Sequence, residues 1–266
     1  MRDPSTPRLH RPAPGVLATS LVSDRALARH SHDVYGIGRI LAGGQRSWSL
    51  AGDVVAMAGD MIMVNPGEVH DGTPLAGQAR RWQMLYLAPE LVDAVGEDVL
   101  PVTQRAPLWR PVARDDRLGA HFERLFRRLV SQADPLARDE AQVTLLAYLL
   151  RQQAGVRERR VATPAIARAR QRLDDDPASD PGLAALATEA GLSRFQLLRA
   201  FARDLGLTPH AYLVQRRLVL ARALIDQGRP IAQAAAEAGF ADQSHMTRAF
   251  TRCLGYTPAT YARARA

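Results

Sequence analysis

The chain of 266 residues contains no lysine, so all 35 of its basic side chains other than histidine are arginine. A guanidinium group is planar and stays charged, and its donors suit phosphate groups and the edge of guanine. A bias toward arginine codons accounts for the replacement of lysine, but not for where the excess charge lies. Residues 1–150 hold 17 Arg and 17 Asp or Glu, net 0, whereas residues 151–266 hold 18 and 10, net +8. All of the surplus positive charge is therefore in the C-terminal part.

Cysteine and long apolar runs are also scarce. Cys253 is the single cysteine, which excludes an intramolecular disulfide and favours a small packing residue over a nucleophile. No apolar run approaches the ~20 residues of a membrane-spanning helix. The start, "MRDPSTPRLHRPAPG", has no apolar stretch after its charges, unlike a secretory signal. We expect a folded, cytoplasmic protein with a flexible Pro-rich start and no membrane partner, large enough for one or two domains.

The chain contains two kinds of hydrophobic pattern. From Ser31 to Leu87, short apolar runs alternate with glycine, as in "SWSLAGDVVAMAGDMIMVNPG", a pattern typical of an antiparallel sandwich or barrel. After Pro111 the spacing becomes helical, with two amphipathic runs separated by the Asp134-Pro135 break. These two helices either form a dimer face or only cover the β unit.

The sequence thus predicts an α+β protein, with a β-barrel and two helices in residues 1–154. The polar segment "GVRERRVATP" reads as a linker over residues 155–164. Residues 165–266 form an all-α domain.

A duplication lies within the C-terminal part. The stretch "EAGLSRFQLLRAF" at residues 189–201 returns as "EAGFADQSHMTRAF" at residues 237–250, and both copies continue with a Gly-x-Thr-Pro-x-x-Tyr frame. In the first copy a short helix ends at Ala190, Gly191 supplies a left-handed turn, and Ser193 caps a second helix. Asp242 is the corresponding cap in the second copy. The sequence predicts two helix-turn-helix units, at residues 183–205 and 231–254.

The second helix of each unit has one apolar face and one outward face. The faces expected to be buried carry Leu197, Ala200, Phe201 and Leu205 in one copy and Met246, Ala249, Phe250 and Leu254 in the other. Such patterns also occur in structural bundles, and arginine on a helix is often only solvated. Two copies with polar outward residues and local positive charge favour DNA, with the two helices in successive major grooves roughly 34 Å apart. The candidate DNA-contacting residues are Arg194, Phe195, Gln196, Arg199, Arg203, Gln243, Ser244, His245, Thr247, Arg248 and Arg252.

Phe195 is an aromatic residue on the outward face. It either packs under the neighbouring helix or touches a thymine methyl group or sugar, and we favour the second. Helix N-termini and three further arginines are expected to contact phosphates. These arginines are Arg216, Arg217 and Arg222.

These motifs resemble the DNA-binding domain of the AraC/XylS family of bacterial transcription regulators. The resemblance covers the C-terminal ~100 residues, through "S-x-x-x-L-x-R-x-F" from Ser193, "GF-x-D-Q-S" from Gly239 and "G-Y-T-P" from Gly255. It implies a transcription factor that binds double-stranded DNA, with RNA polymerase as a partner. The base-reading positions that it implies are Phe195, Gln196 and Arg199 in the first unit and Gln243, Ser244 and Arg248 in the second. Ala234-Ala235 and His245-Met246 depart from the usual pattern, which bears on local packing in the second unit.

Three histidines stand in the predicted β unit, namely His30, His32 and His70. "H-x-H" followed by "P-x-x-x-H" resembles the cupin metal pattern, but Gly36 and Ile37 stand where a glutamate ligand is usual. The family resemblance implies instead a cupin-like domain that binds a small-molecule effector without a metal or other cofactor. The candidate effector-binding residues are His32, Tyr35, His70, Trp82, Met84 and Tyr86.

Two other functions remain open from the sequence. A metal-dependent cupin enzyme with a helical appendage is disfavoured by the missing carboxylate ligand and by the lack of a recognisable catalytic set. We therefore expect no enzymatic activity and assign no catalytic residue. A DNA-binding scaffold that responds to no ligand is the other alternative, because some barrels are filled by their own side chains.

Overall fold

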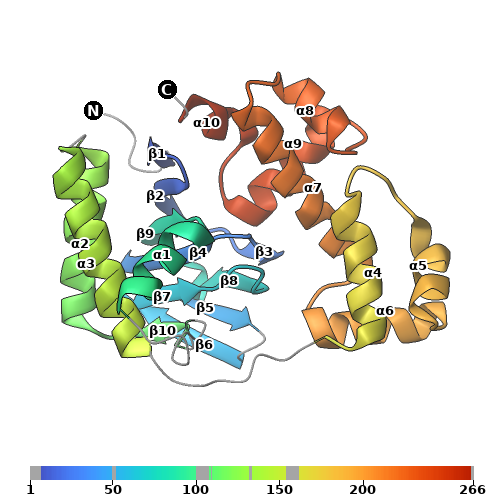
Figure 1. Ribbon diagram of the computed structural model, residues 1–266, viewed down its shortest axis with the longest axis horizontal. Coiled ribbons are helices and arrows are strands. Elements are labelled where there is room, and N and C mark those ends of the chain that lie inside the picture. The colour runs from blue at the N-terminus through green and yellow to red at the C-terminus, as the bar shows by residue number, and fades with distance from the viewer. Residues whose placement is uncertain are drawn as a thin grey trace. The chain divides into compact units, whose positions relative to one another are not determined.

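The computed structural model describes residues 7–49, 52–99, 108, 110–131, 134–153 and 162–264 (Figure 1). These residues form two compact units. We call them the N-terminal unit, built mainly from residues before position 154, and the C-terminal unit, built mainly from residues after position 161. Residues 155–161 of the expected linker, 155–164, lie outside the described residues.

The strands are β1 (Arg8–Ala13), β2 (Val16–Ser23), β3 (Leu27–His30), β4 (Tyr35–Ala42), β5 (Gly44–Ser49), β6 (Gly52–Met57), β7 (Met61–Val64), β8 (His70–Pro74), β9 (Arg80–Leu87) and β10 (Val112–Ala113). The helices are α1 (Pro89–Val99), α2 (Asp116–Val130), α3 (Pro135–Gln153), α4 (Pro164–Asp175), α5 (Gly182–Ala190), α6 (Arg194–Leu205), α7 (Pro209–Asp226), α8 (Ile231–Glu237), α9 (Gln243–Leu254) and α10 (Pro258–Arg263). A 3₁₀ turn, η1 (Leu75–Gly77), precedes β9.

The strands form two sheets. One has the order β1-β2-β9-β4-β7-β10, and the other has the order β3-β8-β5-β6. Neighbouring strands such as β2 and β9, or β5 and β6, run antiparallel. The expectation of an α+β protein with an antiparallel β unit followed by helices is confirmed.

The start of the chain differs from the expectation. Residues 8–13 were expected to be flexible, but they form β1, which pairs with β2 through Arg8 opposite Ser20 and Ala13 opposite Val16. The register shifts between His10 and Ala13, around Pro12. Proline is tolerated there because β1 is the edge of its sheet and the ladder is already irregular.

The register of β4 against β9 assigns side chains to two faces. Ile37 lies opposite Leu85, and both belong to the core cluster that includes residues of α1, α2 and α3. Gly36 and Gly38 alternate with Ile37 and therefore face the other way. We call that second face the inner face; on β9 it carries Trp82, Met84 and Tyr86.

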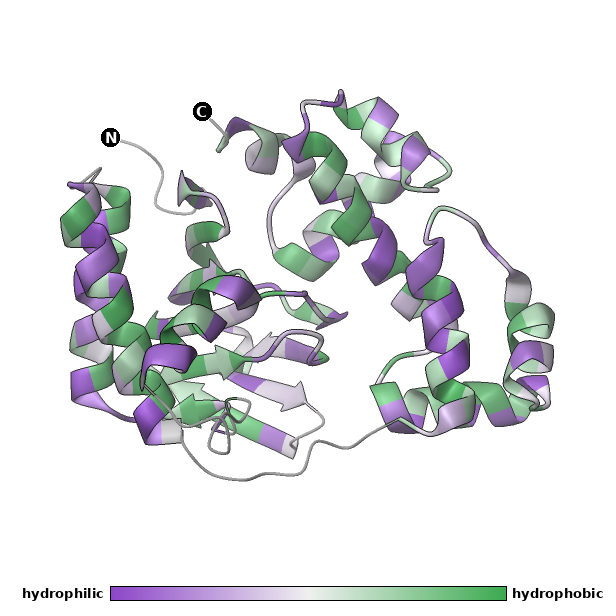
Figure 2. Cartoon of the chain, in the orientation of Figure 1, coloured by the Kyte–Doolittle hydropathy of each residue, from purple (hydrophilic) through white to green (hydrophobic). Residues whose placement is uncertain are grey.

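Helices complete the core of the N-terminal unit. The predicted apolar face of α2 is buried, with Phe122 and Leu125 fully inaccessible to solvent. In Figure 2, hydrophobic and hydrophilic residues alternate along α2 and α3, as expected for helices with one buried side. The helix α1, which contains Gly96, was not expected from the sequence. It contributes Val92 and Val95 to the same core.

From Pro164 onward, the described elements of the C-terminal unit are all helices. α7 packs against α4 and α6 and also against α8 and α9. In Figure 1 it runs between α4, α5 and α6 on one side and α8, α9 and α10 on the other. The core on the α4 to α6 side is centred on Ile166, Leu197 and Phe201, all inaccessible to solvent.

Candidate nucleic-acid interface and effector site

The first helix-turn-helix has the predicted local chemistry. Gly191 ends α5 in the left-handed region at φ 69°. Ser193 then caps α6: its side chain accepts from the Gln196 amide at 3.2 Å, while the Gln196 side chain accepts from the Ser193 amide at 2.9 Å. This reciprocal capping box satisfies two amides at the start of the helix. The predicted turn and cap are confirmed.

The second helix-turn-helix repeats the arrangement with different residues. Gly239 supplies the turn at φ 82°, and the Asp242 carboxylate caps α9 by accepting from the His245 amide at 2.6 Å. Both α6 and α9 end at a left-handed glycine, Gly206 and Gly255. The two copies therefore share their turns and helix ends as well as their sequence frame.

The outward faces are accessible in both copies. Arg199 on α6 and Arg248 on α9 are exposed. Phe195 is 66% exposed, which excludes the alternative that it packs under a neighbouring helix. The Arg199 guanidinium lies 5.5 Å from the centre of the Phe195 ring, so the two side chains form an outward pair. The other exposed candidates are Arg194, Gln196, Arg203, Gln243, Ser244 and Arg252, whereas His245 and Thr247 are half-buried.

Gln196, His245 and Arg203, all candidate DNA-contacting residues, also have partners within the chain. The Gln196 oxygen is used in the capping box, and the His245 ring packs perpendicular to Phe240 with ring centres 5.3 Å apart. Arg203 donates to Asp204 at 2.7 Å. The cap fixes the Gln196 side chain at the start of α6, where its carboxamide nitrogen can still donate to a base.

Asp204 joins the end of α6 to the start of α4. Besides Arg203, its carboxylate accepts from the amide and hydroxyl of Thr163, at 3.1 and 3.0 Å. Burial opposes the charged form, but the hydrogen bonds from Arg203 and Thr163 outweigh it and hold the pKa of Asp204 below its usual value. The carboxylate therefore stays ionised at neutral pH.

The three arginines expected to contact phosphate all have partners within the chain. Arg217 is 8% exposed and donates to backbone carbonyls. Arg216 lies 3.0 Å from Asp174, and the Arg222 guanidinium lies 5.1 Å from the centre of the Tyr261 ring. The expected phosphate contact of Arg217 is wrong because its guanidinium group is buried. For Arg216 and Arg222, which are half-buried, the phosphate contact stays a prediction.

In the N-terminal unit, several of the predicted effector-binding residues lie together. The His32 ring contacts both His70 and Tyr86, with ring centres 5.1 Å apart in each pair. A Cβ built at Gly36 would lie 3.2 Å from Met84 Cε and 3.3 Å from His32 Cε1. His32, His70, Met84 and Tyr86 thus form one cluster at the inner face.

Tyr35 does not belong to this cluster. It pairs with Leu87 across β4 and β9 and packs against the core formed with the helices. Its place on the opposite face follows from the two-residue alternation, since Gly36 is the residue that faces His32. Tyr35 is therefore not a wall residue of the inner face.

Sequence reasoning missed two polar residues on the inner face. Thr19 of β2 lies opposite Met84 of β9 and is fully buried. Its hydroxyl has no hydrogen-bond partner among the described residues. Arg80 is also fully buried; it donates to Gln45 at 2.8 Å and to the Arg25 carbonyl at 3.0 Å. Extending the two-residue alternation of β9 back from Trp82 would have found Arg80.

Arg80 is a buried cation held by neutral groups. Besides the Gln45 and Arg25 acceptors, the Gly72 carbonyl accepts from Nη2 at 3.3 Å, and the guanidinium lies 4.4 Å from the Trp82 ring centre. Burial lowers the pKa of Arg80 to about 10. The side chain remains charged at neutral pH and fixes one face of Trp82.

Each of the three histidines is held by a backbone carbonyl two residues away in the chain. Nδ1 of His30, His32 and His70 lies 2.7 to 3.0 Å from the carbonyls of Ala28, Val34 and Glu68. Across the described part of the chain, no three His, Cys, Asp or Glu side chains are grouped to hold a metal ion. Burial lowers the pKa of His70, although the Glu68 carbonyl and the charges of Glu68 and Asp71 oppose this.

Comparison with known proteins matches both units. Residues 20–150 match the AraC-like ligand binding domain family, and residues 186–264 match a helix-turn-helix domain family. The chain belongs to the AraC/XylS family of transcription regulators. It is accordingly a DNA-binding regulator with an N-terminal ligand-binding domain and a C-terminal helix-turn-helix domain.

Individual AraC-family proteins resemble this chain over most of its length. The HTH-type transcriptional regulator YbfI of Bacillus subtilis is 28% identical over 226 residues, covering 82% of this chain and 80% of YbfI. The arabinose operon regulatory protein of Escherichia coli is 26% identical over 218 residues, covering 79% of this chain and 73% of that protein. The crystal structure of ToxT from Vibrio cholerae has a TM-score of 0.61 at 12% identity, covering 95% and 98% of the two chains, and so shares the fold. Within the described residues, no helix is long and apolar enough to cross a membrane.

Proposed function

We propose that this regulator reads one asymmetric DNA site with α6 and α9, each in its own major groove. The observation that carries this proposal is that two helices on a repeated scaffold leave different side chains exposed. Their turns and helix ends match, whereas the accessible residues differ apart from two arginine pairs, Arg199 with Arg248 and Arg203 with Arg252. Two equivalent helices that expose different side chains suit two different half-sites.

The exposed faces of α6 and α9, which we call the two readers, differ in chemistry. On α6, Phe195 and Leu198 are exposed apolar residues beside Arg199. An apolar side chain in the major groove can contact a thymine methyl group, and arginine can pair with guanine. On α9, the exposed residues Gln243, Ser244 and Arg248 are all polar. We assign methyl contacts and one arginine to the first half-site, and hydrogen-bonded readout to the second.

The effector of this regulator binds at the inner face of the N-terminal unit, without a metal. His32, His70, Trp82, Met84 and Tyr86 provide the wall, and the buried Thr19 hydroxyl adds a polar group that a ligand could satisfy. A ToxT structure is described as bound to an unsaturated fatty acid, which supports the use of this fold for small ligands. We propose that the protein has no enzymatic activity and that RNA polymerase is its partner at a cytoplasmic promoter.

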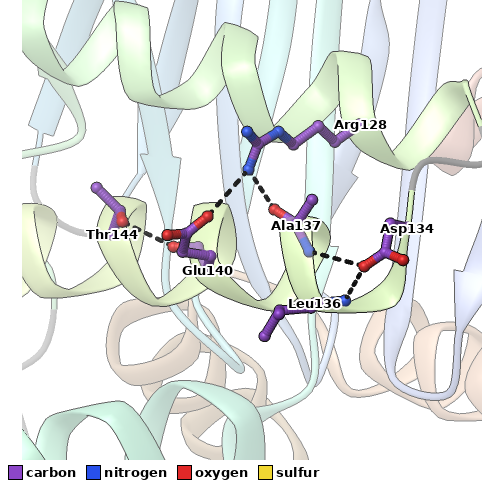
Figure 3. A network of polar contacts seen from close by, with 6 residues as sticks. All are labelled: Arg128, Asp134, Leu136, Ala137, Glu140 and Thr144. Carbon is purple, nitrogen blue, oxygen red and sulfur yellow. Dashed lines mark hydrogen bonds and ion pairs between the residues drawn. The ribbon is translucent and has the colours of Figure 1, made fainter.

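The α2 and α3 helices support a homodimer. Leu136 is 76% exposed and Val143 is 49% exposed, and two turns of α3 separate them, so they share one accessible face. Figure 3 shows how the start of α3 is fixed: the Asp134 carboxylate accepts from the Leu136 amide at 2.9 Å, and Arg128 of α2 reaches the Ala137 carbonyl and, at 3.7 Å, Glu140. A second copy of this face would cover the exposed apolar residues.

Selection of bound fragments from the source genome tests the proposed function. Full-length protein should enrich one motif with two unlike blocks about one helical turn apart, and its affinity should fall with rising salt. The genes beside the enriched sites then indicate the effector class. Enrichment of no motif, or of a single block, would contradict reading by both helices.

A further inference from the structure

Arg217, in α7, is a charged residue buried in the middle of the DNA-binding unit. Its Nε donates to the Pro177 carbonyl at 2.9 Å, and its Nη2 lies 3.4 Å from the Ala178 carbonyl and 3.2 Å from the Ser179 carbonyl. These three consecutive carbonyls belong to the loop between α4 and α5. The planar fork of arginine can hold several acceptors at once, which a lysine ammonium cannot do in the same geometry. Arg217 therefore clamps this loop onto α7.

The same loop rests on the turn of the second helix-turn-helix. A Cβ built at Gly239 would lie 2.3 Å from the Ala178 carbonyl oxygen and 2.9 Å from its carbonyl carbon and Cα. The two backbones are in direct contact there, at a residue whose φ of 82° also favours glycine. The Ala178 carbonyl thus meets Arg217 and Gly239 together.

The contact between Ala178 and Gly239 gives a second connection between the units that contain α6 and α9. α7 packs against α6 and α9 and connects their units through one helix. The loop at residues 177–179 leads into α5 of the first unit and touches Gly239 of the second, so it adds a restraint beside α7. One connection passes through α7, and the other passes through the loop that Arg217 holds on α7.

We propose that Arg217 is a positioning residue that sets the separation and angle between α6 and α9, and thereby the half-site spacing that the protein accepts. This inference rests on the proposed function of two readers in one site. Adding one base pair between half-sites rotates the second half-site by roughly 35° about the DNA axis. A rigid pair of readers discriminates against that rotation, whereas a loosened pair tolerates it.

Full-length Arg217→Lys tests the inference on three kinds of DNA: the selected operator, operators with one base pair added or removed between the blocks, and an operator with one block scrambled. The wild type should bind the altered spacings at least about tenfold more weakly. The variant should discriminate less than about threefold, while its affinity for the scrambled operator stays at the wild-type value. Arg229→Lys is the matched control, because Arg229 is exposed and ion-paired only across 3.8 Å with Glu237.

Each other outcome counts against the inference. If Arg217→Lys is folded by circular dichroism and keeps the wild-type spacing profile, Arg217 does not position the readers. If Arg217→Lys and Arg217→Gln both fail to fold, the residue serves folding of the unit and the positioning role is overturned. A wild type that selects two blocks but ignores their spacing would overturn this inference alone, whereas a wild type that selects no motif would overturn the proposed function as well.

Discussion

Tyr212 donates its hydroxyl hydrogen to Asp174 across 2.7 Å, and Tyr261 makes the equivalent bond to Asp226 across 2.9 Å. Each tyrosine closes one copy of the sequence duplication, and each aspartate lies near the end of the helix that precedes that copy. The tyrosine rings also contact equivalent phenylalanines, Phe201 at 5.6 Å and Phe250 at 5.8 Å between ring centres. The duplication is thus preserved in side-chain contacts as well as in turns.

Tyr212→Phe should destabilise the C-terminal unit. Burial and the bond to Asp174 raise the pKa of Tyr212, so the hydroxyl remains a donor at neutral pH. Losing a hydrogen bond to a charged acceptor costs about 1.5 to 3 kcal/mol, and the remaining contact of Asp174 with Arg216 places the expected loss near the lower limit. Urea unfolding followed by far-ultraviolet circular dichroism measures it. Tyr261→Phe should behave alike; unchanged stability in both variants would contradict a stabilising role for these hydrogen bonds, and a loss in only one would contradict the structural equivalence.

Gly38→Ala should destabilise the N-terminal unit. A Cβ there would lie 2.0 Å from Met84 Sδ and 2.6 Å from the Gln83 carbonyl oxygen, so the inner face has no room for it. Overpacking of this kind costs about 1–3 kcal/mol. Adding Met84→Ala should recover part of the lost stability, because it removes the clash with Met84 Sδ. The recovery should be incomplete because the Gln83 carbonyl oxygen still obstructs the new Cβ. The control is Gly96→Ala, whose Cβ would meet only Leu150 at 3.8 Å. A lower melting temperature for Gly96→Ala than for Gly38→Ala would refute this packing.

His70 should make stability depend on pH below its ordinary pKa of 6.5. Burial lowers the pKa in the folded protein, against Glu68 and Asp71, and the His32 ring lies beside it. Between the two pKa values the unfolded chain binds more protons, so the contribution of His70 is complete above pH 6.5 and is lost as the pH falls toward the folded value. Free energies of unfolding at pH 7.5 and 5.5 should differ less for His70→Asn than for the wild type. Equal differences would count against a His70 that stays neutral in the folded protein as the pH falls below 6.5.

Val143→Asp should separate a dimer into monomers. The substitution places a charge on the exposed face shared with Leu136, and burying it against a second copy would be costly. Sedimentation velocity should give twice the chain mass for the wild type and a single chain for the variant. Val55→Asp, at a residue 48% exposed on β6, should leave the mass unchanged. A dimer that survives Val143→Asp would place its interface elsewhere.

Local signals explain which parts of the fold could be predicted. Gly191, Ser193 and Asp242 act within a few residues of themselves, so turns and caps were accessible from the sequence. The burial of Arg217 was not, because its acceptors lie about 40 residues away in a loop without periodicity. Tyr35 was assigned to the inner face because alternation shows which residues share a face but not which face the helices cover.

The paired-reader account is tested most directly by selecting DNA sequences with the wild type, Arg199→Ala and Arg248→Ala at matched salt. Each substitution should cost about 1–3 kcal/mol and relax base choice in one block only, with the two affected blocks about one helical turn apart. Both substitutions relaxing the same block, or neither changing the selected sequence, would contradict the account.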